Sequence, residues 1–535
     1  MAHEDLREFI GVLEEKDELK RIPLEVHWKY EIGGWVRKTM DLRPKGPALL
    51  FENLKGHNRD YRILCAAVDS YPRFALALGL DAATPVKEII GAYKERLHKP
   101  IKPIMVSTGP VKENVHTGDD VDLLEFPVPW WTPRDGGRYI GTWHGNVTKE
   151  PATGVRNVGM YRVMIHDKRH AGVGFLPSKE IAQHFAEMER QGRPLEMAVV
   201  IGADETIPMV ASASFPPAVD EYDMAGGLRE APIALVKCET VDLEVPANAE
   251  IVLEGHILPF ERKEEGPLSE HTGYHGGGVR MRTVFEVTAI CHRNQPILRG
   301  ALLGKPITEN HTLHAVENAA NAMRMFETHG PSGVVAVCCP PEGDSMAAAV
   351  VAMRPHYVGH SRIVGRALLS SPHGRSLKYV VVVDEDIDPF DLGQVWWAII
   401  YRTQGSRDIE VLRFGPCSRS DPSVPRSQGE YTDKVLIDAT KKLDYPFQRA
   451  WGGHWAPVGF PPRKVMELVD LRWAQIFEGK RGAETQIGQL TRELATELFP
   501  KWETWREKHY KLTAEERERE IHLSLPTTRQ EEEME

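Results

Sequence analysis

The sequence predicts an α+β protein built from several domains. With 535 residues, the chain is longer than one hydrophobic core usually serves, so two or three domains are expected. The pattern from about residue 140 to 308 is mostly that of strands, and a helical period begins after His311. Beyond that helix, helical segments alternate with short apolar runs, which is typical of an α/β layer. These observations together give the fold class.

Residues 1–104 are expected to form a first domain of helices and strands. It opens with an amphipathic helix, because four apolar residues recur at helical spacing. These residues are Leu6, Phe9, Ile10 and Leu13. Prolines at positions 100, 103 and 110 then interrupt the chain and mark a boundary.

Residues 105–308 are expected to form a β-barrel or a sandwich with inserted helices. The segments 283–291 and 250–255 have the alternation of antiparallel strands. Helical interruptions are predicted near 178–192 and 220–229. A helix within 309–326 is long enough to link this domain to the next one.

Residues 327–455 are expected to form an α/β domain, and residues 456–535 a helical extension. The apolar runs Val334–Cys338 and Tyr379–Val383 have the composition of buried parallel strands. In the extension, four apolar residues share one helical face, and Thr513 with Glu516 is typical of a capping box for a last helix. The four residues are Val465, Leu468, Val469 and Ile476.

The composition favours a soluble, cytoplasmic protein and leaves the binding of small molecules open. The formal net charge is −11 and no long basic run is present, which argues against nonspecific binding of nucleic acid. The six cysteines form no CxxC motif, so reduced and buried thiols are expected. The N-terminus is charged, unlike a signal peptide, and no apolar run approaches the roughly 20 residues of a membrane span.

An acidic turn is the first candidate site. The segment Glu264–Tyr274 carries three carboxylates, a histidine and a tyrosine around a Gly-Pro turn. Glu265 and Glu270 flank this turn and can point into one cavity. If one is ionised, the pKa of the other should rise, which suits proton donation near neutral pH. The alternative is a solvated acidic turn without a function.

The segment 156–162, Arg-Asn-Val-Gly-Met-Tyr-Arg, is the second candidate. In an extended chain, Val158, Met160 and Arg162 share one face, opposite Asn157, Gly159 and Tyr161. An arginine on the apolar face of a strand is costly unless it meets an anion. A substrate carboxylate, a phosphate or a nearby glutamate would serve, and a purely structural salt bridge is the alternative.

The segment 220–229, which follows the small residues 211–214, is the third candidate. Carboxylates such as those of this segment, asparagine side chains and backbone carbonyls are hard ligands that suit Mg²⁺, Mn²⁺ or K⁺. The alternative is an ordinary helix N-terminus that carries favourable acidic residues.

Taken in order, these motifs resemble the UbiD decarboxylase family. The sequence contains N-V-G-M-Y-R, D-E-Y-x-x-A-G, E-G-P-x-x-E-x-x-G-Y and E-N-H-T-L, and the segments 383–389 and 395–402 resemble the family's C-terminal domain. The resemblance covers roughly residues 5 to 450. It implies an N-terminal α/β domain (1–104), a split β-barrel that binds prenylated FMN (105–308), a linker helix (309–326) and a C-terminal α/β oligomerisation domain (327–455).

The resemblance also implies an activity, the decarboxylation of an aromatic or α,β-unsaturated carboxylic acid. Glu270 corresponds to the family's proton donor, and Arg162 with Glu265 to an ion pair beside the flavin. The same residues would serve the reverse carboxylation, so the sequence leaves the direction open. The other alternative is a non-catalytic subunit that binds flavin or partners only.

The implied cofactors are prenylated FMN, a divalent ion (Mn²⁺, or Mg²⁺ or Fe²⁺) and K⁺. The divalent ion would be bound by Asn157, Glu180 and Glu221. Many members have histidine where this chain has Glu180, and His184 is a weaker candidate for that ligand. The K⁺ ligands would be Val158, Ala211, Ser212, Ser214 and Glu221. The residues expected to bind the flavin or its ion are Asn157, Val158, Gly159, Met160, Tyr161, Arg162, Lys179, Glu180, Glu221 and Arg402.

The resemblance also bears on the substrate pocket and on the partners of the chain. Lys179 and His271 occupy positions that resemble pocket-lining positions of the family. A basic, polar pocket would favour a polar aromatic acid or an aryl-CoA thioester such as phthaloyl-CoA, unless both side chains face solvent or the flavin phosphate. A flavin prenyltransferase would supply the cofactor, and a homodimer or homohexamer is expected, with neither nucleic acid nor membrane as a partner.

Overall fold

A computed structural model describes residues 3–217, 219–479, 481–498, 515 and 517. The chain divides into two compact units, Met1–Thr440 and Lys441–Glu535. Both helices and strands are abundant in the first unit, so the predicted mixture of α and β structure is confirmed. The expected capping box of Thr513 and Glu516 lies outside the described residues.

The first layer is a four-stranded sheet in the order β1-β2-β3-β16. Its strands are β1 (Leu19–Ile22), β2 (Ala48–Phe51), β3 (Arg62–Cys65) and β16 (Ile297–Arg299), and its helices are α1 (Leu6–Glu15), α2 (Glu31–Asp41), α3 (Tyr71–Ala77) and α4 (Val86–Leu97). The Asp5 carboxylate caps α1 by accepting a hydrogen bond from the Glu8 N–H. The four apolar residues predicted for this helix are all buried. Because β16 comes from the far end of the central domain, the layer joins two distant parts of the chain.

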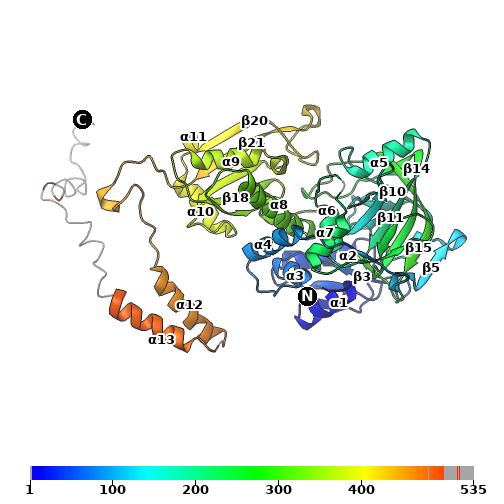
Figure 1. The fold of residues 1–535 in the computed structure, drawn as a ribbon, viewed down its shortest axis with the longest axis horizontal. Helices are drawn as coiled ribbons and strands as arrows, with labels where there is room; N and C mark the ends of the chain where they lie inside the picture. Colours follow the sequence, from blue (N-terminus) through cyan, green and yellow to red (C-terminus); the bar gives the residue numbers. More distant parts are fainter. Residues whose placement is uncertain (1–2, 218, 480, 499–514, 516, 518–535) are drawn as a thin grey trace, which may run out of the picture. The chain divides into compact units, whose positions relative to one another are not determined.

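The central domain is a nine-stranded sheet, β6-β9-β10-β15-β14-β11-β7-β8, with β5 paired to β15. Every strand pair in it is antiparallel. The sheet curls into a half-barrel (Figure 1), so it is one curved sheet and not a sandwich. The strands are β5 (Asn114–Thr117), β6 (Tyr139–Gly141), β7 (His144–Lys149), β8 (Arg156–Gly159), β9 (Val163–Ile165), β10 (His170–Val173), β11 (Leu195–Ile201), β14 (Ile251–Glu265) and β15 (Arg280–His292).

Three helices are inserted between these strands: α5 (Glu180–Arg190), α6 (Thr206–Ser212) and α7 (Glu221–Arg229). The two predicted helical interruptions therefore correspond to α5 and α7. A smaller sheet has the order β13-β12-β4. Its strands are β13 (Glu244–Pro246), β12 (Ala234–Lys237) and β4 (Ile104–Met105).

The C-terminal layer follows the long helix α8 (Glu309–Thr328), which confirms the helix predicted within 309–326. Its sheet has the order β17-β18-β19-β21-β20. The strands are β17 (Val334–Cys338), β18 (Ala348–Met353), β19 (Tyr379–Asp384), β20 (Ile409–Pro416) and β21 (Tyr431–Ala439), and the helices are α9 (His360–Ser370), α10 (Leu392–Arg402) and α11 (Gly405–Asp408).

One of the two predicted parallel strands in this layer is wrong. β19 is parallel to both of its neighbours, as expected, but β17 pairs with β18 in the antiparallel direction. The reason is the connection between β17 and β18, which spans only residues 339–347. A parallel pair needs a crossover of a dozen or more residues, usually with a helix.

The second unit contains α12 (Arg463–Phe477), α13 (Glu484–Glu493) and a π-helical turn, Leu494–Leu498. Leu468 packs with Leu490 and Leu494. Two of the four residues predicted for one apolar face are exposed, Val469 at 42% and Ile476 at 71%. The helix buries one narrow stripe against α13, and these two residues lie outside it.

The state of the cysteines agrees with the prediction of reduced, buried thiols. All six cysteines are free. Five of them are buried and Cys238 is half-buried, so no disulfide contributes to stability. No helix in the described part of the chain is long and apolar enough to cross a membrane.

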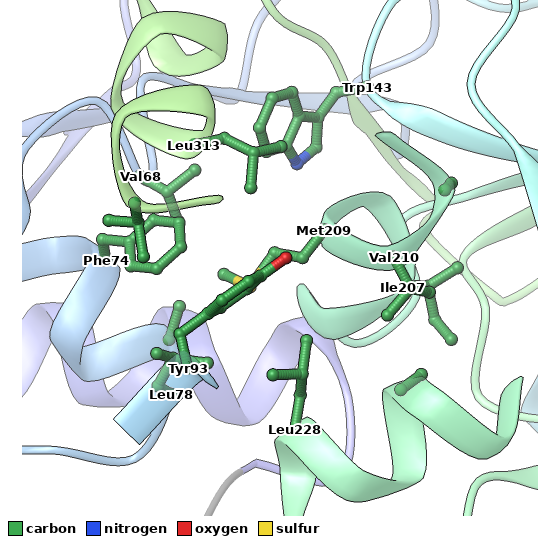
Figure 2. Packing of buried hydrophobic residues seen from close by; sticks show 14 of the residues in the cluster. Val68, Phe74, Leu78, Tyr93, Trp143, Ile207, Met209, Val210, Leu228 and Leu313 are labelled. Carbon is green, nitrogen blue, oxygen red and sulfur yellow. The ribbon is translucent and has the colours of Figure 1, made fainter. Parts of the chain in front are cut away.

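A single hydrophobic cluster joins the helices of the three layers (Figure 2). The labelled side chains come from the N-terminal layer, from the central domain and from α8. They are Val68, Phe74, Leu78, Tyr93, Trp143, Ile207, Met209, Val210, Leu228 and Leu313. Because these apolar side chains are removed from water together, burial in the cluster stabilises each layer in contact with the others.

A buried ionic network crosses the same region. Arg299, at the end of β16, donates from Nε to Glu205 at 2.7 Å and pairs with Glu309, the first residue of α8. Glu309 also accepts the N–H groups of Ala66 and Val68 at 3.0 and 3.1 Å. Burial alone would lower the pKa of Arg299, but the two carboxylates outweigh it and raise the pKa. The guanidinium therefore stays charged and links all three layers.

We expect Arg299→Met to destabilise the protein by about 3–5 kcal/mol, because it leaves two buried carboxylates without their cation. Chemical denaturation followed by circular dichroism measures this change. The control is Arg21→Met, since Arg21 forms exposed pairs with Glu14 and Glu52 that should contribute about 1 kcal/mol or less. Equal losses from both substitutions would contradict the assignment.

Candidate active site

A guanidinium and two carboxylates form the centre of the candidate site. Arg162 follows β8, Glu265 ends β14, and Glu270 lies in the loop 266–279 that joins β14 to β15. Arg162 donates from Nε and Nη2 to both oxygens of Glu265, at 2.9 Å each. Its Nη1 donates to Oε1 of Glu270 at 3.1 Å. The structure therefore brings together the three residues that the sequence singled out.

The two carboxylates differ in their burial. The side chain of Glu265 is fully buried, whereas that of Glu270 is 21% exposed. The Tyr139 hydroxyl donates a further hydrogen bond to Glu265 at 2.9 Å. Burial would lower the pKa of Arg162, but the charge and hydrogen bonds of Glu265 outweigh it, and the pKa is raised. Glu265 is thus fixed in an ion pair, and Glu270 keeps one side open.

Glycines give these charges the space to meet. A Cβ at Gly174 would lie 3.1 Å from Nε of Arg162, and a Cβ at Gly172 would lie 3.1 Å from Cγ of Glu265. A Cβ at Gly277 would lie 3.3 Å from Oε1 of Glu270. A side chain at any of these positions would crowd the charged groups, which would have to shift by a few tenths of an ångström.

The central domain fixes the 266–279 loop through Asp135. This buried carboxylate accepts hydrogen bonds from the Ser269 N–H at 3.0 Å and from the Thr132 N–H at 2.7 Å. It also accepts from the ring of His275 at 3.0 Å. Because Ser269 directly precedes Glu270, this contact fixes the backbone from which the Glu270 side chain projects.

The C-terminal layer holds the same loop from its other side. The His271 ring bonds through Nδ1 to Asp344 at 2.9 Å, and His311 donates from Nε2 to the His271 carbonyl at 2.7 Å. Burial would raise the pKa of Asp344, but hydrogen bonds from His271 and His311 outweigh it and lower the pKa. The ring of His271, a predicted pocket residue, is therefore paired with a carboxylate and does not offer an unpaired positive charge to a substrate.

A second group contains the residues expected to bind a divalent ion. The Asn157 amide donates to Glu180 at 2.7 Å and approaches Glu221 at 3.3 Å. Glu221 also accepts the Val158 N–H at 2.7 Å. Glu180 opens α5 and Glu221 opens α7, so two helix N-termini and one strand present these side chains to a common point.

The donor set fits a hard divalent cation. Oδ1 of Asn157 is buried without a hydrogen-bond partner among the described residues. Burial raises the pKa of Glu221 to about 8, so its charged form lacks full compensation by the protein. Rotation of the amide would direct Oδ1 to the point where the carboxylates converge, because the oxygen and nitrogen of an asparagine are assigned from hydrogen bonds. Three oxygen donors suit Mn²⁺ or Mg²⁺.

The alternative ligand His184 has another contact. It is buried one turn further along α5, and its Nδ1 lies 3.2 Å from the Thr148 hydroxyl. Burial lowers the pKa of His184. The structure places Glu180, and not His184, in contact with Asn157.

The residues expected to bind K⁺ are only partly gathered. The Ala211 carbonyl, near the end of α6, accepts the Met160 N–H at 2.8 Å, which brings Ala211 next to the strand that carries Val158. Ser212 is half-buried and Ser214 is exposed, and neither serine forms a hydrogen bond with Glu221.

Of the remaining sequence-predicted residues, Arg402 lies apart from this group and Lys179 lies next to it. The Arg402 guanidinium bonds to Asp384 and Asp386, each at 2.8 Å. These contacts hold it within the C-terminal layer, so the structure does not bring it to the central site. Lys179 is half-buried directly before α5, where its charge acts on Glu180.

The predicted alternation of strand faces does not extend to Arg162. β8 ends at Gly159, so the alternation assumed as far as Arg162 stops before that residue. Arg162 does meet an anion, as expected, but it does so from the segment between β8 and β9. Glu264, the third carboxylate of the acidic turn, is exposed and does not join the group.

Sequence reasoning missed three residues that shape the site: Tyr139, Asp135 and Asp344. Asp135 lies in an irregular segment rich in glycine, Tyr139 begins the short strand β6 directly after it, and Asp344 comes from another layer. Only the run Pro-Arg-Asp-Gly-Gly at 133–137 carries a local signal, because aspartate before glycine is typical of a turn that uses its own side chain.

Comparisons with known proteins place the chain among carboxy-lyases. The sequence models of the 3-octaprenyl-4-hydroxybenzoate carboxy-lyase N-terminal, Rift-related and C-terminal domains match residues 10–93, 103–306 and 311–439. The phenolic acid decarboxylase of Bacillus subtilis (strain 168) is 32% identical over 483 residues, which is 88% of this chain and 100% of that protein.

Solved structures agree with these matches. The vanillic acid decarboxylase of Sedimentibacter hydroxybenzoicus in its open form has a TM-score of 0.81 and 32% identity, covering 90% of this chain and 100% of that one. The UbiD-class enzyme HmfF from Pelotomaculum thermopropionicum, in complex with FMN, has a TM-score of 0.78 and 31% identity, with 87% and 99% covered. An evolved dimeric form of HmfF in complex with prFMN has a TM-score of 0.73 and 31% identity, with 83% and 97% covered.

We expect Arg162→Gln to destabilise the protein by about 3 kcal/mol, because it leaves the buried Glu265 carboxylate without its cation. The double variant Arg162→Gln/Glu265→Gln should recover most of this loss, since neither charge remains. Glu270→Gln should change stability by about 1 kcal/mol or less, because Glu270 is partly exposed. Urea denaturation of the wild type, of the single variants Arg162→Gln and Glu265→Gln, and of the double variant measures the coupling. Additive losses for Arg162 and Glu265 would contradict the ion pair.

Proposed function

The chain belongs to the UbiD family and is a carboxy-lyase, and from that premise we propose that it decarboxylates an aromatic carboxylic acid with prenylated FMN. The relatives that carry this proposal act on phenolic and vanillic acids or bind FMN and prFMN. The observation that supports it most directly is the position of Arg162 between the buried Glu265 and the partly exposed Glu270.

Each member of this group has a separate task. Glu265 holds Arg162 through two hydrogen bonds, so the guanidinium keeps a fixed orientation and can attract the carboxylate of a substrate. Glu270 binds Arg162 through one hydrogen bond only and keeps an open side. A carboxyl group in that position can deliver a proton to the carbon that has lost CO₂.

The second group would hold the cofactor. Asn157, Glu180 and Glu221 would bind a divalent ion, Mn²⁺ or Mg²⁺, that links the flavin phosphate to the protein. A K⁺ ion beside Glu221 is the corresponding proposal for the monovalent site. When bound, prenylated FMN supplies the electron sink that makes loss of CO₂ feasible, and the protein supplies position, charge and the proton.

For the substrate we favour a hydroxylated aromatic acid. The pair of His271 and Asp344 adds a polar wall to the loop without a net positive charge when the imidazole is protonated. An aryl-CoA thioester such as phthaloyl-CoA would need cations for its phosphates, and among the predicted pocket residues only Lys179 offers one. The reaction would be reversible, because the same groups serve carboxylation at high bicarbonate.

A substrate screen tests the proposal. The chain is co-expressed with a flavin prenyltransferase, and release of CO₂ is measured for phenolic acids, cinnamic acids and aryl-CoA thioesters. We expect turnover of one or more phenolic acids and formation of the acid from the phenol in bicarbonate. A protein that binds prenylated FMN but releases no CO₂ from any of these acids would favour the non-catalytic alternative. Turnover of thioesters alone would contradict the substrate class.

We expect Glu270→Gln to bind prenylated FMN normally but to lower decarboxylation by at least about 10²-fold, because the amide cannot transfer a proton. The flavin absorbance spectrum measures binding, and CO₂ release measures turnover. Incorporation of solvent deuterium into the product should fall in parallel.

The matched control for this prediction is Glu264→Gln. Glu264 is an exposed carboxylate in the same segment, so its loss should leave turnover within about twofold of wild type. Near-normal turnover in Glu270→Gln, together with loss of turnover in Glu265→Gln and an intact fold, would reverse the two assigned roles.

We also propose that the chain assembles into a homodimer or homohexamer through its C-terminal layer. Helix α10 exposes large apolar side chains, with Trp396 63% and Tyr401 70% exposed, and Ile400 51% exposed beside them. Such a patch on a soluble protein is typical of an interface.

Light scattering at micromolar concentration should therefore give a dimer or a larger even oligomer. Trp396→Asp with Tyr401→Asp should shift the mass toward a monomer, because each carboxylate would be costly to bury in an interface. The control is Phe477→Asp, a change of another exposed aromatic residue (66% exposed) outside this layer. A monomeric wild-type protein would contradict the proposal.

A further inference from the structure

A second cluster of metal-ligating side chains lies away from the candidate active site. It contains His116 of β5, Glu125 of the short 3₁₀ helix Leu123–Glu125, and His292, the last residue of β15. Each residue offers one ligand atom, and these three atoms lie within 4.8 Å of one another. Nothing in the proposed decarboxylation uses these residues.

The cluster and the active site occupy opposite ends of one strand. Glu265 pairs with Arg280 at the start of β15, whereas His292 ends this strand of 13 residues. At about 3.3 Å per residue, the path along the strand is roughly 40 Å. The cluster is therefore separate from the groups of Arg162 and Asn157.

The state of His292 points to a ligand. Its ring is 94% buried, since only 6% of its surface is exposed. Nδ1 lies 2.8 Å from the Arg293 carbonyl, which can only accept, so Nδ1 carries the proton. In the neutral ring Nε2 therefore holds the lone pair, and it is buried without a hydrogen-bond partner among the described residues. A buried acceptor without a partner is costly.

The contact of Nδ1 with a backbone carbonyl is also the arrangement that supports metal-binding histidines. A histidine ligand almost always donates its other ring N–H to a carboxylate, a carbonyl or water. His292 meets this requirement before any ion binds. Its free Nε2 is thus in the protonation state that a metal requires.

The fold places the other two ligands beside it. β5 is antiparallel to β15, with Asn114 opposite His292 and His116 opposite Ile290. His116 is therefore the diagonal neighbour of His292 on one face of the sheet, and their ring centroids are 5.1 Å apart. The Tyr61 hydroxyl of the N-terminal layer donates to Oε1 of Glu125 at 3.0 Å, which orients the carboxylate.

We propose that His116, Glu125 and His292 bind one Zn²⁺ ion. Two imidazoles and a carboxylate are a usual zinc donor set, whereas Mg²⁺ and Ca²⁺ prefer oxygen ligands alone. Tetrahedral ligands at about 2.0–2.1 Å lie about 3.4 Å from one another, so small side-chain rotations would close the present arrangement. The fourth position would be left for water.

The expected role of this ion is structural. It would join the edge strand β5 and the segment 118–126 to the end of β15. Through the hydrogen bond between Glu125 and Tyr61, it would also fix the central domain to the N-terminal layer. Binding to the folded protein alone would raise its thermal stability.

Metal titration of the full chain tests the proposal. The protein is stripped with a chelator, desalted and titrated with Zn²⁺, and Co²⁺ serves as the spectroscopic substitute. We expect one equivalent of Zn²⁺ to bind at this cluster, with a rise in Tm of several degrees. Co²⁺ should give the strong visible bands of a four- or five-coordinate site with nitrogen ligands. The oxygen ligands of the Asn157 group would give only weak bands, so the spectrum separates the two sites.

Variants assign the ion to these residues. His116→Ala and Glu125→Gln should each weaken Zn²⁺ binding by at least about 10-fold and abolish the rise in Tm. The matched control is His256→Ala, another half-buried histidine of the same sheet, which should bind Zn²⁺ as wild type does. Both test residues are only partly buried, so at least one variant should fold. Two results would overturn the proposal. One is weak Co²⁺ bands in the wild type, and the other is unchanged Zn²⁺ binding in both variants.

Discussion

The buried guanidinium of Arg299 is the interaction on which the rest of the structure depends. It lies where β16 enters the N-terminal sheet, and its two carboxylate partners belong to the central domain and to α8. The hydrophobic cluster around it supplies most of the stabilisation, but apolar contacts have no direction. The ionic network has one satisfactory geometry, because each buried charge must meet its partner. It therefore fixes how the three layers fit, and with them the loops that form the site.

The candidate site repeats this chemistry with one difference. Both Arg299 and Arg162 bind two glutamates, but the Arg299 network is closed on all sides, whereas Glu270 beside Arg162 is 21% exposed. Complete burial gives a charge a structural task. Partial exposure leaves a carboxyl group that can meet a ligand and exchange a proton. The two clusters contain the same residue types. Exposure to solvent and ligands thus distinguishes the structural cluster of Arg299 from the cluster of Arg162, which is proposed to act in catalysis.

Local patterns in the sequence were sufficient for features that depend on near neighbours. The helices α1 and α8, the strands β14 and β15, and the gathering of Arg162, Glu265 and Glu270 were all expected. The direction of β17 was not, because it depends on the length of a connection more than on composition. Tyr139, Asp135 and Asp344 were missed, since each reaches the site from a segment far away in sequence. The free Nε2 of His292 likewise arises only when β5 and the end of β15 meet.

The loop 266–279 is anchored twice, to Asp135 of the central domain and to Asp344 of the C-terminal layer. Glu270 lies between these anchors, next to His271. The C-terminal layer therefore cannot move relative to the central sheet without displacing Glu270 or breaking the contact of His271 with Asp344. A ligand that binds more tightly to one arrangement of the layers shifts the equilibrium toward that arrangement. By thermodynamic linkage, the factor of this shift equals the ratio of the ligand's affinities for the two arrangements. The contact between His271 and Asp344 therefore couples the ligand affinity of the site to the arrangement of the domains.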